Sequence, residues 1–351
     1  MQQPLRTIYL RRLISHVKSV MDAKTSMAFL LLKRRKTVKK NRLVSRLIQM
    51  CVVLIGISFL TFLLTYLAPG DPATAMYDSL GITPSPEMLE QARQSMGLDK
   101  PFLQQYVDWI GGIFHGDFGT SFSKSAPVLD LLMKRLPATF RLALFSLGLM
   151  LIISVPLGIL SAVRQDGIAD YIVRFLSFLG ISLPGFLIGL ILLYVFALKL
   201  GLVKVASSSV GMEQMLLPGI TLAIAMASKY SRQVRTAVLE ELHQDYVTGA
   251  RARGMNQWEI LFRQVLPNAM LPLVTMLGLS FGSLLGGTSV VEIIFSYPGL
   301  GILAVGAVKA RDYPLIQGFV LWIALIYMVV NLLVDISYHY IDPRTREGEN
   351  G

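Results

Sequence analysis

The stretch EELHQDYVTGARARGMNQWEILFRQVLPNAMLP, residues 240–272, is a polar interval inside a run of apolar segments. Its pattern predicts two short helices, near Leu242–Arg253 and Gln257–Leu266, separated by Gly254. Because glycine adopts a positive φ without a steric penalty, Gly254 is expected to supply the turn between these helices.

The second of these helices has apolar residues at i, i+3, i+4 and i+7, which is the spacing of one helix face. These residues are Trp258, Leu261, Phe262 and Val265. Pro267 and Pro272 are expected to mark the far end of the loop, because proline lacks a backbone donor. The pattern is typical of an amphipathic segment on a membrane surface. It also fits a docking element, and pattern alone leaves both interpretations open.

Composition indicates a membrane protein. Of 351 residues, 53% are hydrophobic and 16% are charged, whereas roughly a quarter of residues are charged in a soluble domain. The net charge of +11 does not indicate nucleic-acid binding, since residues 1–50 alone hold 13 of the 33 basic residues. A basic extension of this kind is expected to contact anionic membrane lipid.

Six apolar segments are long enough to cross a bilayer, which needs about 20 apolar residues. The polar interval 68–138 after the first segment contains helical patterns near Pro86–Met96 and Phe102–Phe114. The sequence therefore predicts an all-α, polytopic membrane protein with a small extracytoplasmic helical subdomain. The predicted spans are Leu47–Leu67, Phe140–Val163, Phe175–Leu198 (broken at Leu183–Gly185), Leu216–Arg235, Leu271–Val291 and Leu315–Ile336.

The distribution of basic residues predicts the orientation. With the N-terminus inside, the inner segments carry 23 of the 33 Lys and Arg residues. The positive-inside rule then places both termini and residues 240–272 in the cytoplasm.

The sequence shows no catalytic machinery. It contains no Gly-Lys dipeptide and hence no P-loop, and neither HExxH nor CxxC occurs. Its four histidines are scattered over different segments, so no metal site and no cofactor are predicted. The chain is therefore not expected to be an enzyme.

An ion-coupled secondary transporter is the alternative from another class. Such carriers place ionisable residues near the bilayer midplane. In this chain Arg141, Glu292, Asp335 and His339 lie at the ends of the predicted spans, where they are interpreted as reaching the interface. This placement favours an external source of energy.

The loop resembles the EAA loop of ABC importer permeases, in the spacing from Gly254 to Leu266-Pro267. Thr248-Gly249-Ala250 stands where that family has Glu-Ala-Ala, and Gln264 stands in place of Ile. Further motifs resemble the peptide/nickel branch of these permeases over Leu47–Arg344. They include Pro69-Gly70-Asp71-Pro72, Gly97-Leu98-Asp99-Lys100-Pro101, Gly116-Asp117-Phe118-Gly119-Thr120-Ser121, Tyr297-Pro298-Gly299-Leu300-Gly301 and Arg311-Asp312-Tyr313-Pro314.

The resemblance implies a type I ABC importer permease in a bacterial cytoplasmic membrane. Its partners would be a second homologous permease, two cytoplasmic ATPases and an extracytoplasmic binding protein. It divides the chain into a basic extension (1–46), a transmembrane domain (47–339) containing the outer subdomain (68–138) and the coupling loop (240–272), and a cytoplasmic tail (340–351).

The resemblance also assigns site residues. Those expected to couple the chain to the ATPase are Tyr246, Ala250, Arg251, Arg253, Gly254, Trp258, Leu266 and Pro267. Gly286, Gly287 and Pro184 are expected at the interface with the second permease or along the path. Family members carry nickel, metal chelates, dipeptides or oligopeptides. The segments Thr83–Leu89 and Phe178–Pro184 favour the nickel type slightly over the peptide type.

Overall fold

The computed structural model describes residues 45–79, 81–203 and 211–341, and within these ranges the chain is helical and contains no strand. The chain divides into two units, Met1–Gly56 and Ile57–Gly351. Of the first unit, the described residues 45–56 form the beginning of the helix Ser45–Leu67. The predicted extension 1–46 and tail 340–351 therefore lie almost entirely outside the described residues.

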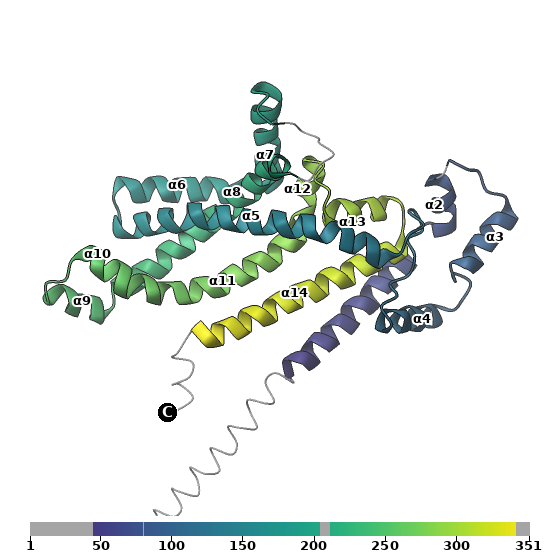
Figure 1. Ribbon diagram of the computed structural model, residues 1–351, viewed down its shortest axis with the longest axis horizontal. Coiled ribbons are helices and arrows are strands. Elements are labelled where there is room, and N and C mark those ends of the chain that lie inside the picture. The colour runs from purple at the N-terminus through teal and green to yellow at the C-terminus, as the bar shows by residue number, and fades with distance from the viewer. Residues whose placement is uncertain (1–44, 80, 204–210, 342–351) are drawn as a thin grey trace, which may run out of the picture. The chain divides into compact units, whose positions relative to one another are not determined.

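Figure 1 shows the order of the helices. In residues 68–138, the two predicted helices are confirmed as α3 and α4. Ser85 is the N-cap of α3, and its Oγ accepts a hydrogen bond from the Met88 amide (3.3 Å). The helices that follow Leu67 are α2 (Pro72–Ser79), α3 (Pro86–Ser95), α4 (Phe102–Phe114), α5 (Val128–Val163), α6 (Ile168–Ser182), α7 (Gly185–Leu192), η1 (Leu193–Lys199), α8 (Met212–Leu242), α9 (Asp245–Ala252), α10 (Gln257–Ile260), η2 (Leu261–Val265), α11 (Leu266–Gly287), α12 (Ser289–Ile294), α13 (Leu300–Lys309) and α14 (Tyr313–Ile341).

Three described helices are long and apolar enough to cross a membrane, and two bent helix pairs bring the number to five if each pair is one span. The three are Ser45–Leu67, α5 and residues Tyr313–Val334 of α14. The first two contain the first and second predicted spans, and the third covers most of the sixth. The fourth predicted span lies in α8, which is 31 residues long but more polar than the other three. The number of six spans stays a prediction.

The third predicted span is sharply bent. The break expected at Leu183–Gly185 is confirmed, and it turns Ile168–Ser182 by 99° against Gly185–Lys199. Pro184 lacks an amide donor, and it restricts Leu183 to an extended conformation (φ −87°, ψ 130°), which ends α6. The chain is therefore not one straight helix here, as the predicted break implied, but the sequence pattern did not indicate the size of the bend.

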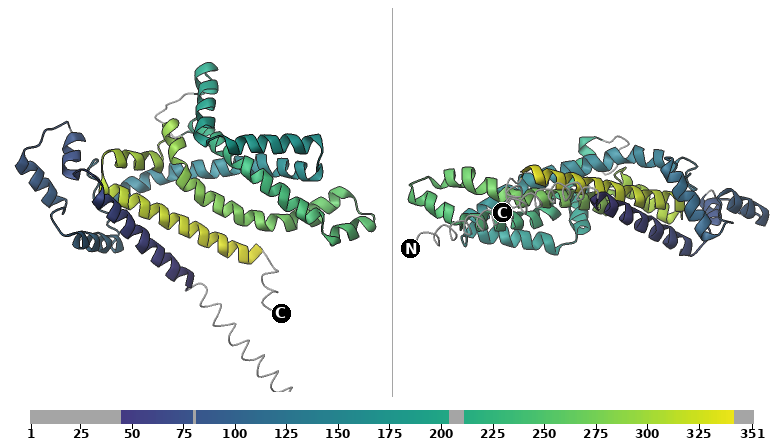
Figure 2. Two further views of the ribbon diagram at one scale, coloured as in Figure 1. Left: turned by 180° about the vertical axis from the view of Figure 1, so that it is seen from behind. Right: turned by 90° about the horizontal axis from the view of Figure 1, so that it is seen from below.

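The core of the second unit is built on α5 and α8, which pack along each other more extensively than any other pair of helices. Small residues allow this close approach. A Cβ atom added to Gly158 of α5 would lie 2.6 Å from Cβ of Val234, and one added to Gly219 of α8 would lie 2.4 Å from the Phe145 ring. Another pair of long helices, α11 and α14, also lie against each other, as the front and back views both show (Figures 1 and 2).

The interpretation that charged residues at the span ends extend to the membrane interface is wrong for Glu292. It is fully buried in α12, where Oε1 accepts hydrogen bonds from the hydroxyls of Thr139 (2.8 Å) and Thr288 (3.1 Å). Oε2 accepts bonds from the amides of Gly301 (2.6 Å) and Ile302 (3.2 Å) at the start of α13. The carboxylate thus ties α5, α12 and α13 together and satisfies two free amides of a helix N-terminus.

We expect Glu292→Gln to lower the midpoint of thermal unfolding, measured on the purified protein in detergent. An amide group in this position turns an N–H donor toward either the two α13 amides or the two threonine hydroxyls. Leaving buried donors unsatisfied costs about 1–3 kcal/mol. The matched control is Glu213→Gln, at an exposed residue in the first turn of α8. Equal melting of the two variants would contradict the anchoring role of Glu292.

Candidate docking site

The turn between the two short helices of residues 240–272 is a hydrogen-bonded helix cap at Gly254. At the end of α9, the Gly254 amide donates to the carbonyl of Arg251 (2.9 Å), and the Met255 amide donates to the carbonyl of Ala250 (3.3 Å). These two bonds form a Schellman motif, which places a left-handed residue at Gly254. Its φ is +78°, so the predicted positive φ is confirmed. A Cβ there would meet no atom within 4 Å, so the constraint comes from the backbone alone.

The apolar residues of the second helix lie on two faces, and the prediction of a single apolar face is wrong. Leu261 and Val265 are buried, with exposed fractions of 2% and 0%, whereas Trp258 and Phe262 are 62% and 61% exposed. The helix is a π-helix over Leu261–Val265, and its wider turn changes the direction of side chains relative to an α-helix. One apolar pair therefore anchors the loop while the other faces outward.

The exposed aromatic pair is held in place locally. The rings of Trp258 and Phe262 are stacked, with centroids 6.2 Å apart and planes inclined by 23°. The Trp258 amide donates to Oδ1 of Asn256 (3.1 Å), which caps the start of α10. Because the cap and the stacking both restrict the helix start, the two rings present a pre-organised apolar surface.

Tyr246 connects three helices around the loop. Its hydroxyl donates to Oε2 of Glu241 at the end of α8 (2.6 Å) and accepts a bond from Nδ2 of Asn268 at the start of α11 (3.4 Å). Asn268 also donates to the carbonyl of Gln264 (2.9 Å). Tyr246 therefore fixes α9 relative to the two long helices that enter and leave the loop.

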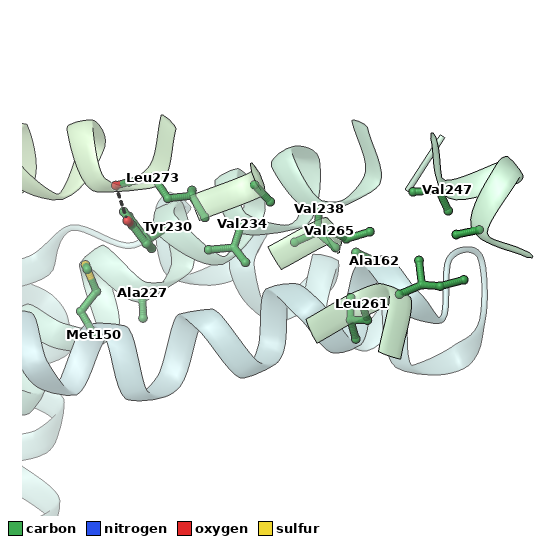
Figure 3. Packing of buried hydrophobic residues seen from close by; sticks show 13 residues of the cluster. Met150, Ala162, Ala227, Tyr230, Val234, Val238, Val247, Leu261, Val265 and Leu273 are labelled. Atoms are coloured by element: carbon green, nitrogen blue, oxygen red, sulfur yellow. Dashed lines mark hydrogen bonds between the residues drawn. The ribbon is translucent and has the colours of Figure 1, made fainter. Parts of the chain in front are cut away.

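A continuous apolar cluster joins the loop to the long helices (Figure 3). Val247 of α9 and Val265 of η2 belong to the same buried cluster as Ala162 at the end of α5 and Val238 of α8. Further along α8, the hydroxyl of Tyr230 donates to the carbonyl of Leu273 in α11 (2.6 Å). Since buried side chains are closely packed, a displacement of the loop has to move α5, α8 and α11.

The remaining predicted coupling residues differ in exposure. Ala250 is buried in the cluster, and Leu266 is half-buried. Arg251, Arg253 and Pro267 are exposed. A cavity of about 190 Å³ lies beside this surface, and it is lined by Val163, Leu242, Arg251, Gln257, Trp258, Ile260 and Leu261.

The predicted end of the loop at Pro267 is corrected. Helical structure continues without a gap from Gln257 through η2 into α11, and Pro272 lies inside α11. The Leu266 amide donates to the carbonyl of Leu261, five residues back. The backbone hydrogen bond just before Pro267 therefore spans five residues, whereas in an α-helix it spans four. Proline has no amide to donate, so the helix continues past it with one bond fewer.

The residues predicted for the permease interface lie away from this loop. Pro184 is exposed at the bend between α6 and α7. Gly286 is exposed near the end of α11, where an added Cβ would meet no atom within 4 Å. Gly287 is the last residue of the same helix. The structure does not bring these residues into contact with the loop.

Two features of the docking site were not predicted from the sequence, which named Phe262 only as part of the apolar face: the stacking of Phe262 on Trp258 and the helix cap at Asn256. Phe262 lies at i+4 from Trp258, the spacing at which two helical side chains meet, so their stacking was available as a signal. Asn256 stands directly before the second helix, where asparagine is a favoured N-cap.

Comparison with known proteins identifies relatives over most of the chain. Residues 154–347 match the family model described as "Binding-protein-dependent transport system inner membrane component". Residues 40–143 match the N-terminal model of the same membrane component.

Three relatives show the range of names in this group. The probable D,D-dipeptide transport system permease protein DdpB of Escherichia coli (strain K12) is 36% identical, over 85% of this chain and 95% of the relative. The oligopeptide transport system permease protein AppB of Bacillus subtilis (strain 168) is 39% identical, over 86% and 98%. The nickel import system permease protein NikB of Staphylococcus aureus (strain RF122 / ET3-1) is 38% identical, over 86% and 90%.

A solved structure has the same fold. A chain of the MetNI methionine ABC transporter in an inward-facing conformation superposes with a TM-score of 0.50 at 18% identity, and the match covers 60% of this chain and 96% of that one.

Proposed function

The chain belongs to the family of binding-protein-dependent transport system inner membrane components, and we propose that its residues 240–272 dock it to a cytoplasmic ATPase. It is a multi-pass membrane protein and the permease subunit of an ABC importer of the peptide and nickel family. In the proposed assembly, two ATPases supply the energy, a second permease completes the translocation path, and an extracytoplasmic binding protein delivers the cargo.

The observation that carries the docking proposal is the exposed, stacked pair Trp258–Phe262 on a loop whose other apolar side chains are buried in the cluster with α5, α8 and α11, among them Val247, Leu261 and Val265. Aromatic residues in pockets dominate the energy of many protein interfaces. The neighbouring Arg251 and Arg253 supply charge at the rim of this surface. Gly254 sets the direction of α9 relative to α10, so it is proposed to fix the shape of the docking surface.

The length of α5 between its contact with α12 and its contact with the loop supports a position of these two regions on opposite sides of the membrane. Thr139 binds Glu292, and Ala162 packs in the loop cluster 23 residues later. At 1.5 Å per residue these points are about 35 Å apart, against about 30 Å for the hydrocarbon core. With the distribution of basic residues, this supports six spans, cytoplasmic termini and a cytoplasmic loop.

Gly286 and Gly287 are proposed to contact the second permease. The exposed Gly286 has free space where a side chain would stand, and glycines on helix surfaces permit close packing in membranes. Pro184 is proposed to line the path, because it stands at the bend of the α6–α7 pair.

For the cargo we keep nickel or a small metal chelate as the first candidate and short peptides as the second. The sequence segments 83–89 and 178–184 favour the former, and the names of the relatives include both. The ligand retained by the cognate binding protein on purification distinguishes them, by metal analysis and by mass spectrometry of the released ligand.

The docking proposal is tested by purifying the tagged chain from a cell that expresses the complete transport system. The proposal expects the two ATPases to co-purify and their ATP hydrolysis to rise when the loaded binding protein is added. A chain that purifies without any ATPase, under conditions that retain the second permease, would overturn it.

A further inference from the structure

A pocket of about 800 Å³ lies among residues 62–122 and the start of α14, far in sequence from the docking loop. Its walls come from the end of the helix Ser45–Leu67, from α3 and α4, and from the turn at Gly119-Thr120. All lining residues belong to the second unit. Pockets of this size hold small-molecule ligands in other proteins.

One wall carries a carboxylate with an open oxygen. Asp71 accepts bonds from Nε (3.3 Å) and Nη2 (3.0 Å) of Arg93 and from the amide (3.3 Å) and hydroxyl (2.9 Å) of Thr74, all at Oδ2. Among the described residues, no bond is made to Oδ1. Asp71 and Arg93 both line the pocket, with 26% and 43% of their side chains exposed. Oδ1 is therefore available to a donor.

A second ion pair lines the same pocket. Nζ of Lys100 donates to Oδ2 of Asp108 (2.7 Å), and both side chains are about half exposed. The hydrogen bond to Asp108 raises the pKa of Lys100. Burial alone would raise the pKa of Asp71, but its bonds with Arg93 and Thr74 outweigh this and keep that pKa below its ordinary value. Asp71 and Lys100 thus stay charged at neutral pH.

The same pocket also has an aromatic part of its lining. Phe62 is buried against Trp109, with ring centroids 5.7 Å apart, and Tyr66 is half-exposed beside them. The indole N–H of Trp109 is buried and has no acceptor among the described residues. A donor left without a partner calls for an acceptor from water or from a ligand.

We propose that this pocket binds a small zwitterion, namely a free amino acid or short peptide. The two acidic and two basic side chains of the lining carry no net charge. A simple cation or anion that approached the side chain of opposite charge would therefore also lie beside a side chain of its own charge. A ligand with both an ammonium and a carboxylate can pair with both kinds of group. Because half-exposed ion pairs are weak, they can exchange partners with such a ligand.

A cargo site on the permease itself extends the proposed function. It rests on the proposed function only in assuming that cargo reaches this pocket. It does not require the docking loop. Binding can therefore be measured without nucleotide, and a failure of this proposal is distinct from a failure of ATPase docking.

The test is isothermal titration calorimetry on the assembled importer in nanodiscs, without binding protein or ATP. The probes are phenylalanylalanine, the same dipeptide with acetylated and amidated ends, histidine with Ni²⁺, and Ni²⁺ alone. We expect the free dipeptide to bind at least tenfold more tightly than the capped dipeptide. The histidine chelate should also bind weakly, because its amine is coordinated to the metal and carries no ammonium. Equal binding of the capped dipeptide, binding of Ni²⁺ alone, or no binding of any probe would overturn the proposal.

Matched variants locate the site. Asp71→Asn keeps an acceptor for Thr74 but removes the charge, and we expect a loss of at least tenfold in affinity. Asp78→Asn, at an exposed residue of α2 outside the pocket, should leave the affinity unchanged. Lys100→Gln is compared in the same way with Lys124→Gln, also exposed and outside the lining. Equal effects within either pair, with all variants folded, would place the binding elsewhere.

Discussion

Replacing both Trp258 and Phe262 by alanine is expected to release the ATPases from the importer while leaving the permease folded. The two rings are exposed and stacked, so they contribute little to the core of the chain. If they fill a pocket on the ATPase, their loss removes a binding hot spot, which corresponds to about 2 kcal/mol or more and so to roughly 30-fold weaker binding. The measurement is the amount of ATPase retained on the tagged permease after dilution.

The control for this variant separates docking from folding. Phe114→Ala removes another strongly exposed aromatic ring, at the end of α4, and should retain the ATPases fully. Leu261→Ala, at a buried residue of the loop, should instead lower the stability of the permease by about 2–5 kcal/mol. Normal ATPase retention by the Trp258→Ala, Phe262→Ala double variant would show that the aromatic pair contacts something else, such as lipid.

Gly254→Val is expected to insert into the membrane normally and pair with the second permease, but to lose most ligand-stimulated ATP hydrolysis. The Schellman motif holds this residue at φ +78°. A left-handed conformation costs about 1–2 kcal/mol for a residue with a Cβ, and valine is among the least suited to it. That cost shifts the equilibrium away from the native angle between α9 and α10 by a factor of about 5–30.

Gly116→Val is the matched control, because Gly116 also has a positive φ (+80°), and a Cβ there meets no atom within 4 Å. It carries the same backbone strain but lies after α4, far in sequence from the loop. We expect it to keep ligand-stimulated hydrolysis. If both glycine variants lose stimulation equally, general instability explains the result and the specific role of the Gly254 turn is refuted.

Much of the helical framework was predictable because local signals set it. The helices α3 and α4 follow Ser-Pro and Pro-Phe starts, and Gly254 is a position at which only a residue tolerant of positive φ closes the cap. The apolar runs indicated the helices but not the 99° bend at Pro184. The size of a bend depends on what each half packs against, and that information is not local.

The candidate docking site was predictable in place but not in detail. The pattern of Trp258, Leu261, Phe262 and Val265 indicated one apolar face, and the π-helix divides it into a buried and an exposed pair. Likewise, the sequence placed Glu292 at a span end, whereas its buried carboxylate is bound by the hydroxyls of Thr139 and Thr288, 153 and 4 residues away along the chain. Such features arise from tertiary contacts that periodicity does not report.

This permease is proposed to move cargo with energy supplied by partner ATPases that dock on residues 240–272. Uptake into proteoliposomes tests it most directly, with the complete importer compared with the chain alone, and ATP compared with an imposed proton or sodium gradient. We expect uptake only by the complete importer, only with ATP and loaded binding protein, and its loss in the Trp258→Ala, Phe262→Ala double variant. Gradient-driven uptake by the chain alone would contradict it and would favour an ion-coupled carrier.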